Sequence, residues 1–315
     1  MSSGPVLITG AAGFVGRHLS AHLEASGDDV VGIDRTPEHG GVDITDVTAI
    51  SELIAKVAPS VIYHLAGWAD VGGSWKDPVT AFRVNAEGTL NVLGAARDAG
   101  VERVLAVSSA DVYGKVDPSE LPLTEDSPLR PASPYAASKV AADYLGLQAW
   151  LGRGLPVLRV RAFNHLGPGQ TDAFVAPALA SRIARAERAG GDEPHVLPIG
   201  DLPARRDFTD VRDVVRAYRL LVEHGEPGEV YNVCTGVDLA VQDLADQLLA
   251  QATVPIRFET DPELLRPVEV PVLRGSHQRL TAATGWEPEI SIRDTLTDLL
   301  EDWRTRVAAE PTEPT

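Results

Sequence analysis

The sequence predicts an α/β protein, with a Rossmann-type, doubly wound parallel sheet followed by a smaller mixed α/β C-terminal lobe. A glycine-rich turn follows the first apolar run, strand-like and helical patterns alternate to about residue 165, and proline-rich stretches near 194–203 and 262–271 predict loops. We expect a first domain of residues 1–165 and about 206–235, and a second lobe of about 166–205 and 236–308. Residues 309–315, mostly polar and proline-rich, are expected to form a flexible tail.

The glycine turn predicts a dinucleotide site. An apolar run at 6–9 leads into three regularly spaced glycines, and an apolar stripe at helical spacing follows. Such glycines let the backbone approach a pyrophosphate at the start of the next helix, whereas the alternative is a plain flexible loop. The residues expected to contact the dinucleotide here are Gly10, Gly13, Phe14, Val15 and Gly16.

A second apolar strand, 30–33, ends at Asp34, about where an acid binds the adenosine ribose in such sites. This makes the loop alternative less favourable. The carboxylate would accept hydrogen bonds from the ribose hydroxyls and repel a 2′-phosphate, but Arg35 follows directly and could reach that phosphate. We therefore prefer NAD(H) as the cofactor, with NADP(H) as the alternative.

Composition and charge restrict the partners. The chain of 315 residues is 44% hydrophobic, and no apolar run approaches the length of a membrane span. No leader-like segment precedes the first strand, so we expect a cytoplasmic protein without a membrane partner. The net charge of −17 argues against a nucleic-acid partner. The single cysteine, Cys234, stands in an apolar strand-like run and predicts a buried thiol; no metal site is expected.

Further elements follow from pattern and capping signals. Strands are expected at 61–65, 104–107, 157–160 and 230–233, and a helix is expected to begin within 206–211. One long helix opens at Asp77 and Pro78 and closes at Gly100, and another opens at Ser133 and Pro134. The two helices, about 78–99 and 134–152, could pair across the axis of a homodimer.

Tyr135 and Lys139 stand four residues apart near the start of the second long helix. That spacing places both side chains on one helix face, where the ammonium would lower the pKa of the phenol. An ordinary solvated helix face is the alternative for the pair alone. Together with the dinucleotide turn, the pair predicts that Tyr135 carries a proton.

The combined motifs resemble the extended short-chain dehydrogenase/reductase family (the NAD-dependent epimerase/dehydratase family), in its nucleotide-sugar branch. The matching segments are 9–16, 43–44, 64–67, Asn85, 108–109, 135–139 and 161–165. The resemblance implies that Ser109 hydrogen-bonds the reacting sugar oxygen beside Tyr135, and that Lys139 binds the nicotinamide ribose. It implies that the remaining cofactor contacts come from Asp43, Ile44, Leu65, Ala66, Gly67, Asn85 and Phe163.

Within this branch the segments 64–78, 163–170 and 265–273 are most similar to GDP-4-keto-6-deoxy-mannose reductases. The resemblance implies that the second lobe binds a GDP-linked sugar. The implied substrate contacts are Trp68, Ser109, Asn164, Phe174, Val175, Arg206, Arg266 and Glu269. Surface ion pairs are the alternative for Arg206, Arg266 and Glu269. The indole of Trp68 stands where related enzymes carry smaller polar residues, so the exact sugar stays open.

Three reactions remain open. Reduction of a 4-keto sugar needs only Ser109, Tyr135, Lys139 and a nicotinamide, and is preferred. A nucleotide-sugar 4-epimerase would use the same residues with a tightly bound NAD. A GDP-mannose-type 4,6-dehydratase would also need a carboxylate two residues after Ser109, where Asp111 is one methylene shorter than the Glu of that family. A non-catalytic dinucleotide sensor is a distant alternative, since all three active-site residues are present.

Overall fold

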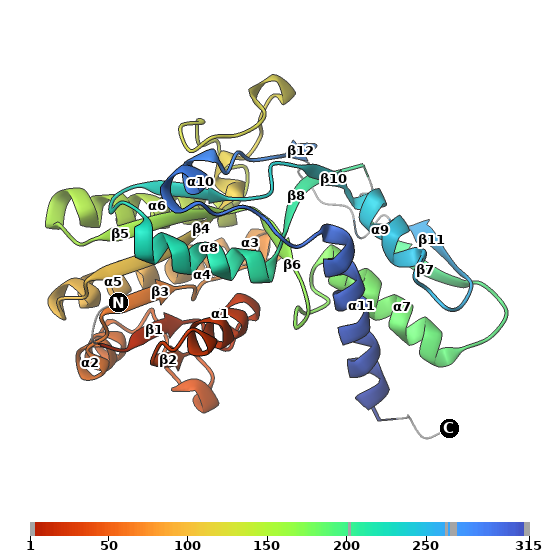
Figure 1. Cartoon of the computed structure of the whole chain (residues 1–315), viewed down its shortest axis with the longest axis horizontal. Helices are drawn as coiled ribbons and strands as arrows, with labels where there is room; N and C mark the ends of the chain where they lie inside the picture. Colours follow the sequence, from red (N-terminus) through yellow and green to blue (C-terminus); the bar gives the residue numbers. More distant parts are fainter. Residues whose placement is uncertain (1–3, 201–202, 262–263, 265–269, 312–315) are drawn as a thin grey trace.

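The computed structural model describes residues 4–200, 203–261, 264 and 270–311. A six-stranded, fully parallel sheet in the order β2-β1-β3-β4-β5-β9 forms the larger part, on the left of Figure 1. Its strands are β1 (Val6–Thr9), β2 (Val30–Ile33), β3 (Val61–His64), β4 (Arg103–Ser109), β5 (Val157–Ala162) and β9 (Val230–Val233). The predicted doubly wound Rossmann-type sheet is confirmed.

Helices cover both faces of this sheet, because its strands are apolar on both sides. One core lies under α1 (Phe14–Ala25), α8 (Val211–His224) and α10 (Gln278–Thr284). The other lies under α2 (Val47–Val57), α5 (Gly88–Asp98) and α6 (Pro134–Arg153). The short helices α3 (Val71–Lys76) and α4 (Pro78–Phe82) pack on the start of α6.

The predicted long helix at 78–99 is capped as expected but is not uniform. The side chain of Asp77 accepts a hydrogen bond from the backbone N–H of Thr80 at 3.1 Å, and Gly100 follows the last turn with φ +69°. Between α4 and α5, Arg83–Glu87 form a turn of π-helix. Such wider turns often occur at functional sites, and this one contains Asn85.

The second lobe, on the right of Figure 1, has its own core under α7 (Val175–Ala189), α9 (Val241–Leu249) and α11 (Ile292–Ala309). Strand β8 (Arg205–Asp210) lies between β10 (Asp238–Ala240) and β12 (Val272–Leu273), and β6 (Asn164–Leu166) also pairs with it. Strands β7 (His195–Ile199) and β11 (Ile256–Thr260) form a parallel pair.

Two local predictions were wrong in this lobe. The segment 206–211 was expected to begin a helix, but Arg205–Asp210 is strand β8, and the helix begins only at Val211 with Asp210 as its N-cap. Pairing with three other strands outweighs the polar composition of the segment. The expected loop at 194–203 contains strand β7. Helix α11 extends one residue into the segment 309–315, and Glu310 pairs with Arg185 at 2.9 Å.

Candidate active site

The turn after β1 has a geometry that only glycine fits. Gly10 has φ +76°, and a Cβ there would lie 2.8 Å from the backbone nitrogen of Ala66. A Cβ on Gly16 would lie 2.2 Å from the carbonyl oxygen of Gly10. Gly13 is the N-cap of α1 and offers no side-chain acceptor to the N–H groups of the first turn. These residues fit a dinucleotide, whose pyrophosphate binds uncapped helix N-termini through backbone N–H groups.

The remaining predicted dinucleotide residues of this region surround the turn. Phe14 begins α1, and its ring stacks on the ring of His165 with centroids 6.2 Å apart. Val15 packs partly buried against the core under α1. Leu65, Ala66 and Gly67 follow the end of β3, and the backbone N–H of Leu65 donates to the carbonyl of Thr9 at 3.1 Å. The carboxyl ends of β1 and β3 are therefore held together, as ligand sites in such sheets require.

Asp34 follows the carboxyl end of β2, and one of its carboxylate oxygens accepts a hydrogen bond from the backbone N–H of Arg35 at 2.7 Å. Asp43 accepts two hydrogen bonds from Thr45, both at 2.8 Å. The backbone hydrogen bond from Thr45 is the main cause that lowers the pKa of Asp43. Ile44 is buried against Gly88, where it can form an apolar wall.

The start of α6 positions Tyr135. The hydroxyl oxygen of Ser133 caps the helix by accepting a hydrogen bond from the backbone N–H of Ala136 at 3.1 Å. The backbone N–H of Tyr135 donates to the hydroxyl oxygen of Ser74 in α3, also at 3.1 Å. The cap of α6 and the hydrogen bond to α3 therefore fix the backbone at Tyr135.

The phenol of Tyr135 is buried and hydrogen-bonded to the side chain of Ser109. Burial raises the pKa of Tyr135 above its ordinary value, the negative charge of Asp111 raises it further, and the hydrogen bond from Ser109 opposes both. Ser109 also caps the 3-10 helix Ala110–Tyr113, since its hydroxyl oxygen accepts from the backbone N–H of Asp111 at 3.1 Å. The phenol therefore keeps its proton at neutral pH.

Lys139 lies one turn beyond Tyr135, and its ammonium donates to the carbonyl oxygen of Val107 at 3.1 Å. Burial lowers the pKa of Lys139 to about 8. The pKa of Tyr135 is raised overall, not lowered as its spacing with Lys139 predicted, because burial of the phenol dominates and the charge of Asp111 adds to it. The stabilisation of a phenolate by Lys139 stays a prediction.

Asn85 links three parts of the site. Its side-chain oxygen accepts from the backbone N–H of Trp68 at 2.8 Å, and its amide nitrogen donates to the carbonyl of Trp68 at 3.2 Å. The same nitrogen donates to the hydroxyl of Ser138 at 2.8 Å. A Cβ on Gly67 would lie 2.8 Å from the side-chain oxygen of Asn85 and 3.3 Å from the Lys139 nitrogen. The loop after β3 is thus fixed against the π-helical turn and α6.

The predicted substrate residues are more dispersed. Asn164 is exposed on β6, while Phe174 and Val175 are partly exposed at the start of α7. Arg206 lies on β8 and donates to the carbonyl of Arg205 at 2.8 Å. Arg266 and Glu269 lie outside the described residues. Phe163, expected at the cofactor, is buried, and Trp68 is half-buried, with its indole N–H bonded to the carbonyl of Asp70 at 2.6 Å.

Sequence reasoning assigned no role to the buried polar residues that support the site. His64, at the end of β3, is 3% exposed and bonds to Thr9 and Thr89. His64 is a polar residue at the end of an apolar strand and the first residue of segment 64–67, which matches the family. This polar position could have indicated its role. Next to the site, the carboxylate of Asp143 on α6 forms ion pairs with the guanidinium groups of Arg159, at 2.6 Å, and Arg161, at 2.8 Å.

The remaining expectations concern Cys234, metal sites and membrane-spanning helices. Cys234 is buried, and burial raises the pKa of its thiol, so the prediction of a buried thiol is confirmed. Within the described ranges, no cluster of three or more His, Cys, Asp or Glu residues could hold a metal ion. In the same part of the chain, no helix has the length and apolarity needed to cross a membrane.

A parallel sheet, a glycine cradle at the carboxyl ends of its strands, and Ser109, Tyr135 and Lys139 beside it define a dinucleotide-dependent enzyme of the short-chain dehydrogenase type. Residues 6–234 match the model of the NAD dependent epimerase/dehydratase family. The chain belongs to this family, as the sequence predicted.

Relatives within the family act on nucleotide-linked sugars. The chain is 40% identical to the GDP-6-deoxy-D-mannose reductase of Pseudomonas aeruginosa, over 97% of this chain and 99% of the relative. It is 33% identical to the UDP-glucose 4-epimerase of Mycolicibacterium smegmatis, over 95% and 98%. A P. aeruginosa protein solved in complex with NADPH superposes with a TM-score of 0.86 at 39% identity, covering 96% of this chain and 100% of that one.

Proposed function

We propose that this protein reduces the C4 ketone of a GDP-linked 4-keto-6-deoxy hexose with NAD(P)H. The observation that carries the proposal is the buried, protonated phenol of Tyr135, hydrogen-bonded to Ser109. The similarity to a GDP-6-deoxy-D-mannose reductase over nearly the whole of both chains supports the choice of substrate.

The chain's own residues match what reduction requires. A bound reduced nicotinamide supplies a hydride to the sugar carbon. Tyr135 then gives its proton to the C4 oxygen, and its raised pKa keeps that proton available until negative charge develops there. The Ser109 hydroxyl, already bonded to the phenol, orients the same oxygen. The Lys139 ammonium, held at the carbonyl of Val107, places a positive charge one helical turn from the phenolate that forms.

Asp111 disfavours dehydration as the main reaction. A dehydratase needs a carboxylate that removes a proton from the sugar, but Asp111 lies in the first turn of the 3-10 helix Ala110–Tyr113, where its backbone N–H is bonded to Ser109. Its side chain is one methylene shorter than Glu, and a misplacement of about an ångström can cost on the order of a hundredfold in rate. Asp111 is better suited to raise the pKa of Tyr135.

A 4-epimerase is the second candidate, because an epimerase uses the same three residues and the chain is 33% identical to a UDP-glucose 4-epimerase. The first step of epimerisation removes a proton from the sugar hydroxyl, which needs an ionised Tyr135. The positive nicotinamide ring of a bound NAD+ would lower the cost of that ionisation, so the raised pKa of the phenol in the chain alone does not separate the two reactions. The higher identity to the GDP-6-deoxy-D-mannose reductase, 40% against 33%, favours the reductase.

The deciding experiment supplies the purified protein with GDP-4-keto-6-deoxy-mannose and either NADH or NADPH, and in parallel with UDP-glucose. We expect oxidation of the dinucleotide with the first substrate and no C4 epimer of the second. Tyr135→Phe should lower turnover by about 10²- to 10⁴-fold while dinucleotide affinity is kept. Unchanged turnover in Tyr135→Phe would refute the mechanism, whereas UDP-galactose formation would favour the epimerase.

Asp34 favours NAD(H), while Arg35 and the relative solved with NADPH leave NADP(H) as the alternative. Asp34→Ala should weaken NADH selectively, since a carboxylate binds the ribose hydroxyls, and Arg35→Ala should weaken NADPH selectively. The ratio of kcat/KM for the two dinucleotides decides between them.

The cytoplasm is the compartment we propose, because the chain uses a cellular dinucleotide and its one cysteine forms no internal disulfide.

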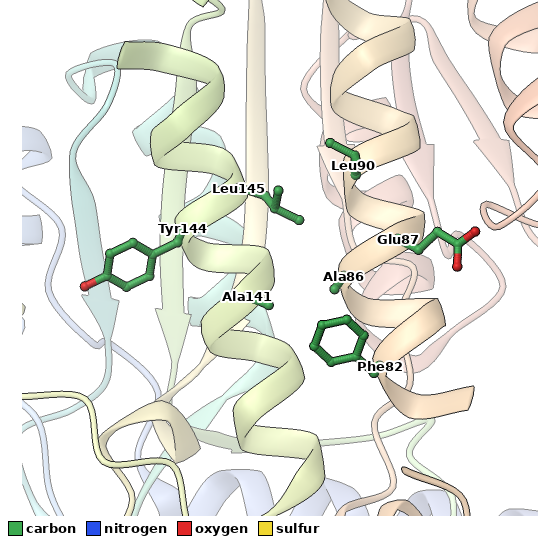
Figure 2. Close-up of a pocket in the computed structure, with 7 residues that line it drawn as sticks. All are labelled: Phe82, Ala86, Glu87, Leu90, Ala141, Tyr144 and Leu145. Atoms are coloured by element: carbon green, nitrogen blue, oxygen red, sulfur yellow. The ribbon is translucent and has the colours of Figure 1, made fainter. Parts of the chain in front are cut away.

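We also propose a homodimer through the helices at about 78–99 and 134–152. Figure 2 shows the apolar groove between them, of about 450 Å³, lined by Phe82, Ala86, Glu87, Leu90, Ala141, Tyr144 and Leu145. Phe82 and Leu90 are each 50% exposed and Tyr144 is 54% exposed. Glu87 is the only charged residue in this lining, so a second copy of the same face can pack here across a two-fold axis with little charge repulsion.

A further inference from the structure

His64 ends strand β3 and bonds through both ring nitrogens to hydroxyl groups. Its Nδ1 lies 2.8 Å from Oγ1 of Thr9, and its Nε2 lies 3.0 Å from Oγ1 of Thr89. The two threonines are 0% and 4% exposed, so the group is closed to solvent. A buried imidazole in such a place must have a definite tautomer, and its partners determine which one.

The direction of each hydrogen bond follows from its neighbours. The hydroxyl of Thr89 donates its only proton to the carbonyl oxygen of Asn85 at 2.6 Å, so it accepts from His64, and Nε2 carries the proton. Nδ1 then accepts from the hydroxyl of Thr9, whose oxygen accepts from the backbone N–H of Ala66 at 3.2 Å. The opposite tautomer would deprive the Asn85 carbonyl of the Thr89 proton. Burial and the charge of Lys139 lower the pKa of His64 to about 3, so the ring is neutral.

We propose that His64 is a positioning residue that fixes Asn85, and through it the loop at Trp68, by a one-directional chain of hydrogen bonds. This series of hydrogen bonds runs from the N–H of Ala66 through Thr9, His64 and Thr89 to the carbonyl of Asn85. It joins the carboxyl ends of β1 and β3 to the π-helical turn, three elements separated in sequence by up to 76 residues (9 to 85).

The position of Asn85 matters because its side chain binds both the loop after β3 and helix α6. It binds the backbone of Trp68 through two hydrogen bonds and the hydroxyl of Ser138 through a third. That hydroxyl donates to the backbone carbonyl of Tyr135 at 2.7 Å. A shift of the Asn85 backbone therefore moves the loop that carries Trp68 relative to the helix that carries Tyr135. Asn85 lies in the π-helical turn, a rare and wider turn, and the hydrogen bond from Thr89 to its carbonyl oxygen holds the backbone there.

Two amide substitutions separate the links. In His64→Gln the side-chain amide nitrogen takes the place of Nε2 and can still donate to Thr89, while the link to Thr9 is lost. In His64→Asn the amide oxygen takes the place of Nδ1 and can still accept from Thr9, while the link to Thr89 and Asn85 is lost. We expect kcat/KM to fall about a hundredfold in His64→Asn and much less in His64→Gln, with similar losses in melting temperature. Equal losses of kcat/KM in the two variants, or losses that follow melting temperature, would overturn the proposal.

The turnover measurement rests on the proposed function, so two further readouts need no sugar substrate. ¹⁵N NMR of the imidazole should show Nε2 protonated and Nδ1 unprotonated from about pH 6 to pH 8. Thr89→Val, which removes the hydroxyl, should weaken NADH binding at least about tenfold more than Thr89→Ser, which keeps it. A protonated Nδ1 or equal affinities would refute the positioning role. Failure of the wild-type protein to reduce the sugar would refute only the proposed function.

Discussion

Lys139 donates a hydrogen bond of 3.1 Å to the carbonyl oxygen of Val107, and this bond ties the helix that carries Tyr135 to strand β4. Lys139 is buried, 8% exposed, and burial is the cause that lowers the pKa of its ammonium to about 8. The charge that would stabilise a Tyr135 phenolate is therefore lost within the range of pH at which the protein can be assayed.

The first prediction is that the reduction rate declines as the pH rises through about 8. Below that pH Lys139 is charged and supports proton donation by Tyr135, and above it the neutral amine no longer does. Lys139→Met should be slower than the wild type below about pH 8 and should lack the decline, whereas Lys139→Arg keeps its charge and should move the decline upward. Profiles of kcat against pH for the three proteins test this. An unchanged alkaline limb in Lys139→Met would assign the decline to another group.

Gly16 gives the second prediction. A Cβ at this position would lie 2.2 Å from the carbonyl oxygen of Gly10, which is a backbone atom and cannot turn aside. Gly16→Ala should therefore shift α1 from the turn, cost about 1–3 kcal/mol of stability and weaken dinucleotide binding. Gly94→Ala is the matched control, because nothing lies within 4 Å of its Cβ and the residue is inside helix α5. Gly94→Ala should leave dinucleotide binding unchanged. Equal losses of binding in both variants would contradict the role of Gly16 in the dinucleotide site.

The sequence predicted the sheet, the glycine turn and the helix of Tyr135 because each depends on local signals. Alternating apolar runs, a cap at Ser133 and the spacing of Tyr135 and Lys139 are all visible within a few residues. The strand at 205–210 was missed for the opposite reason. Its sequence is polar, and only pairing with strands distant in the chain makes it extended.

The electrostatics of the site could not be predicted from spacing alone. The pKa of Tyr135 depends on how deeply the phenol is buried and on how near Asp111 lies, and both depend on the folded backbone. The same holds for His64, whose partners come from β1 and α5. A residue's type in a motif indicates what it can bind, whereas its environment decides which protons it holds.

The third prediction concerns the buried carboxylate of Asp143. It has no exposed side-chain surface and binds Arg159 at 2.6 Å and Arg161 at 2.8 Å. Asp143→Asn removes the negative charge and leaves two buried guanidinium groups without their partner, so the free energy of unfolding should fall by about 3–5 kcal/mol. Urea denaturation measures the loss. Asp98→Asn, in an exposed pair with Arg97, should change stability by less than about 1 kcal/mol. A small effect at Asp143 would mean that water or other groups replace its charge.

The fourth prediction tests the proposed homodimer. Phe82→Glu places a charge at the apolar groove of Figure 2, once on each copy across the two-fold axis, so the paired face should be disrupted. Light scattering should give twice the chain mass of 33.5 kDa for the wild type and the single mass for the variant.

Val196→Glu is the control for this charge. Val196 is 44% exposed on β7, in the second lobe at the far side of Figure 1 from α6, and faces Arg257 across the strand pair. A glutamate there is compatible with its neighbour, so this variant should remain a dimer. A wild type of single mass would refute the dimer, and dissociation of both variants would show that the assembly depends on net charge. Dissociation of Phe82→Glu alone, with its circular dichroism unchanged, would assign the interface to the face of α4, α5 and α6.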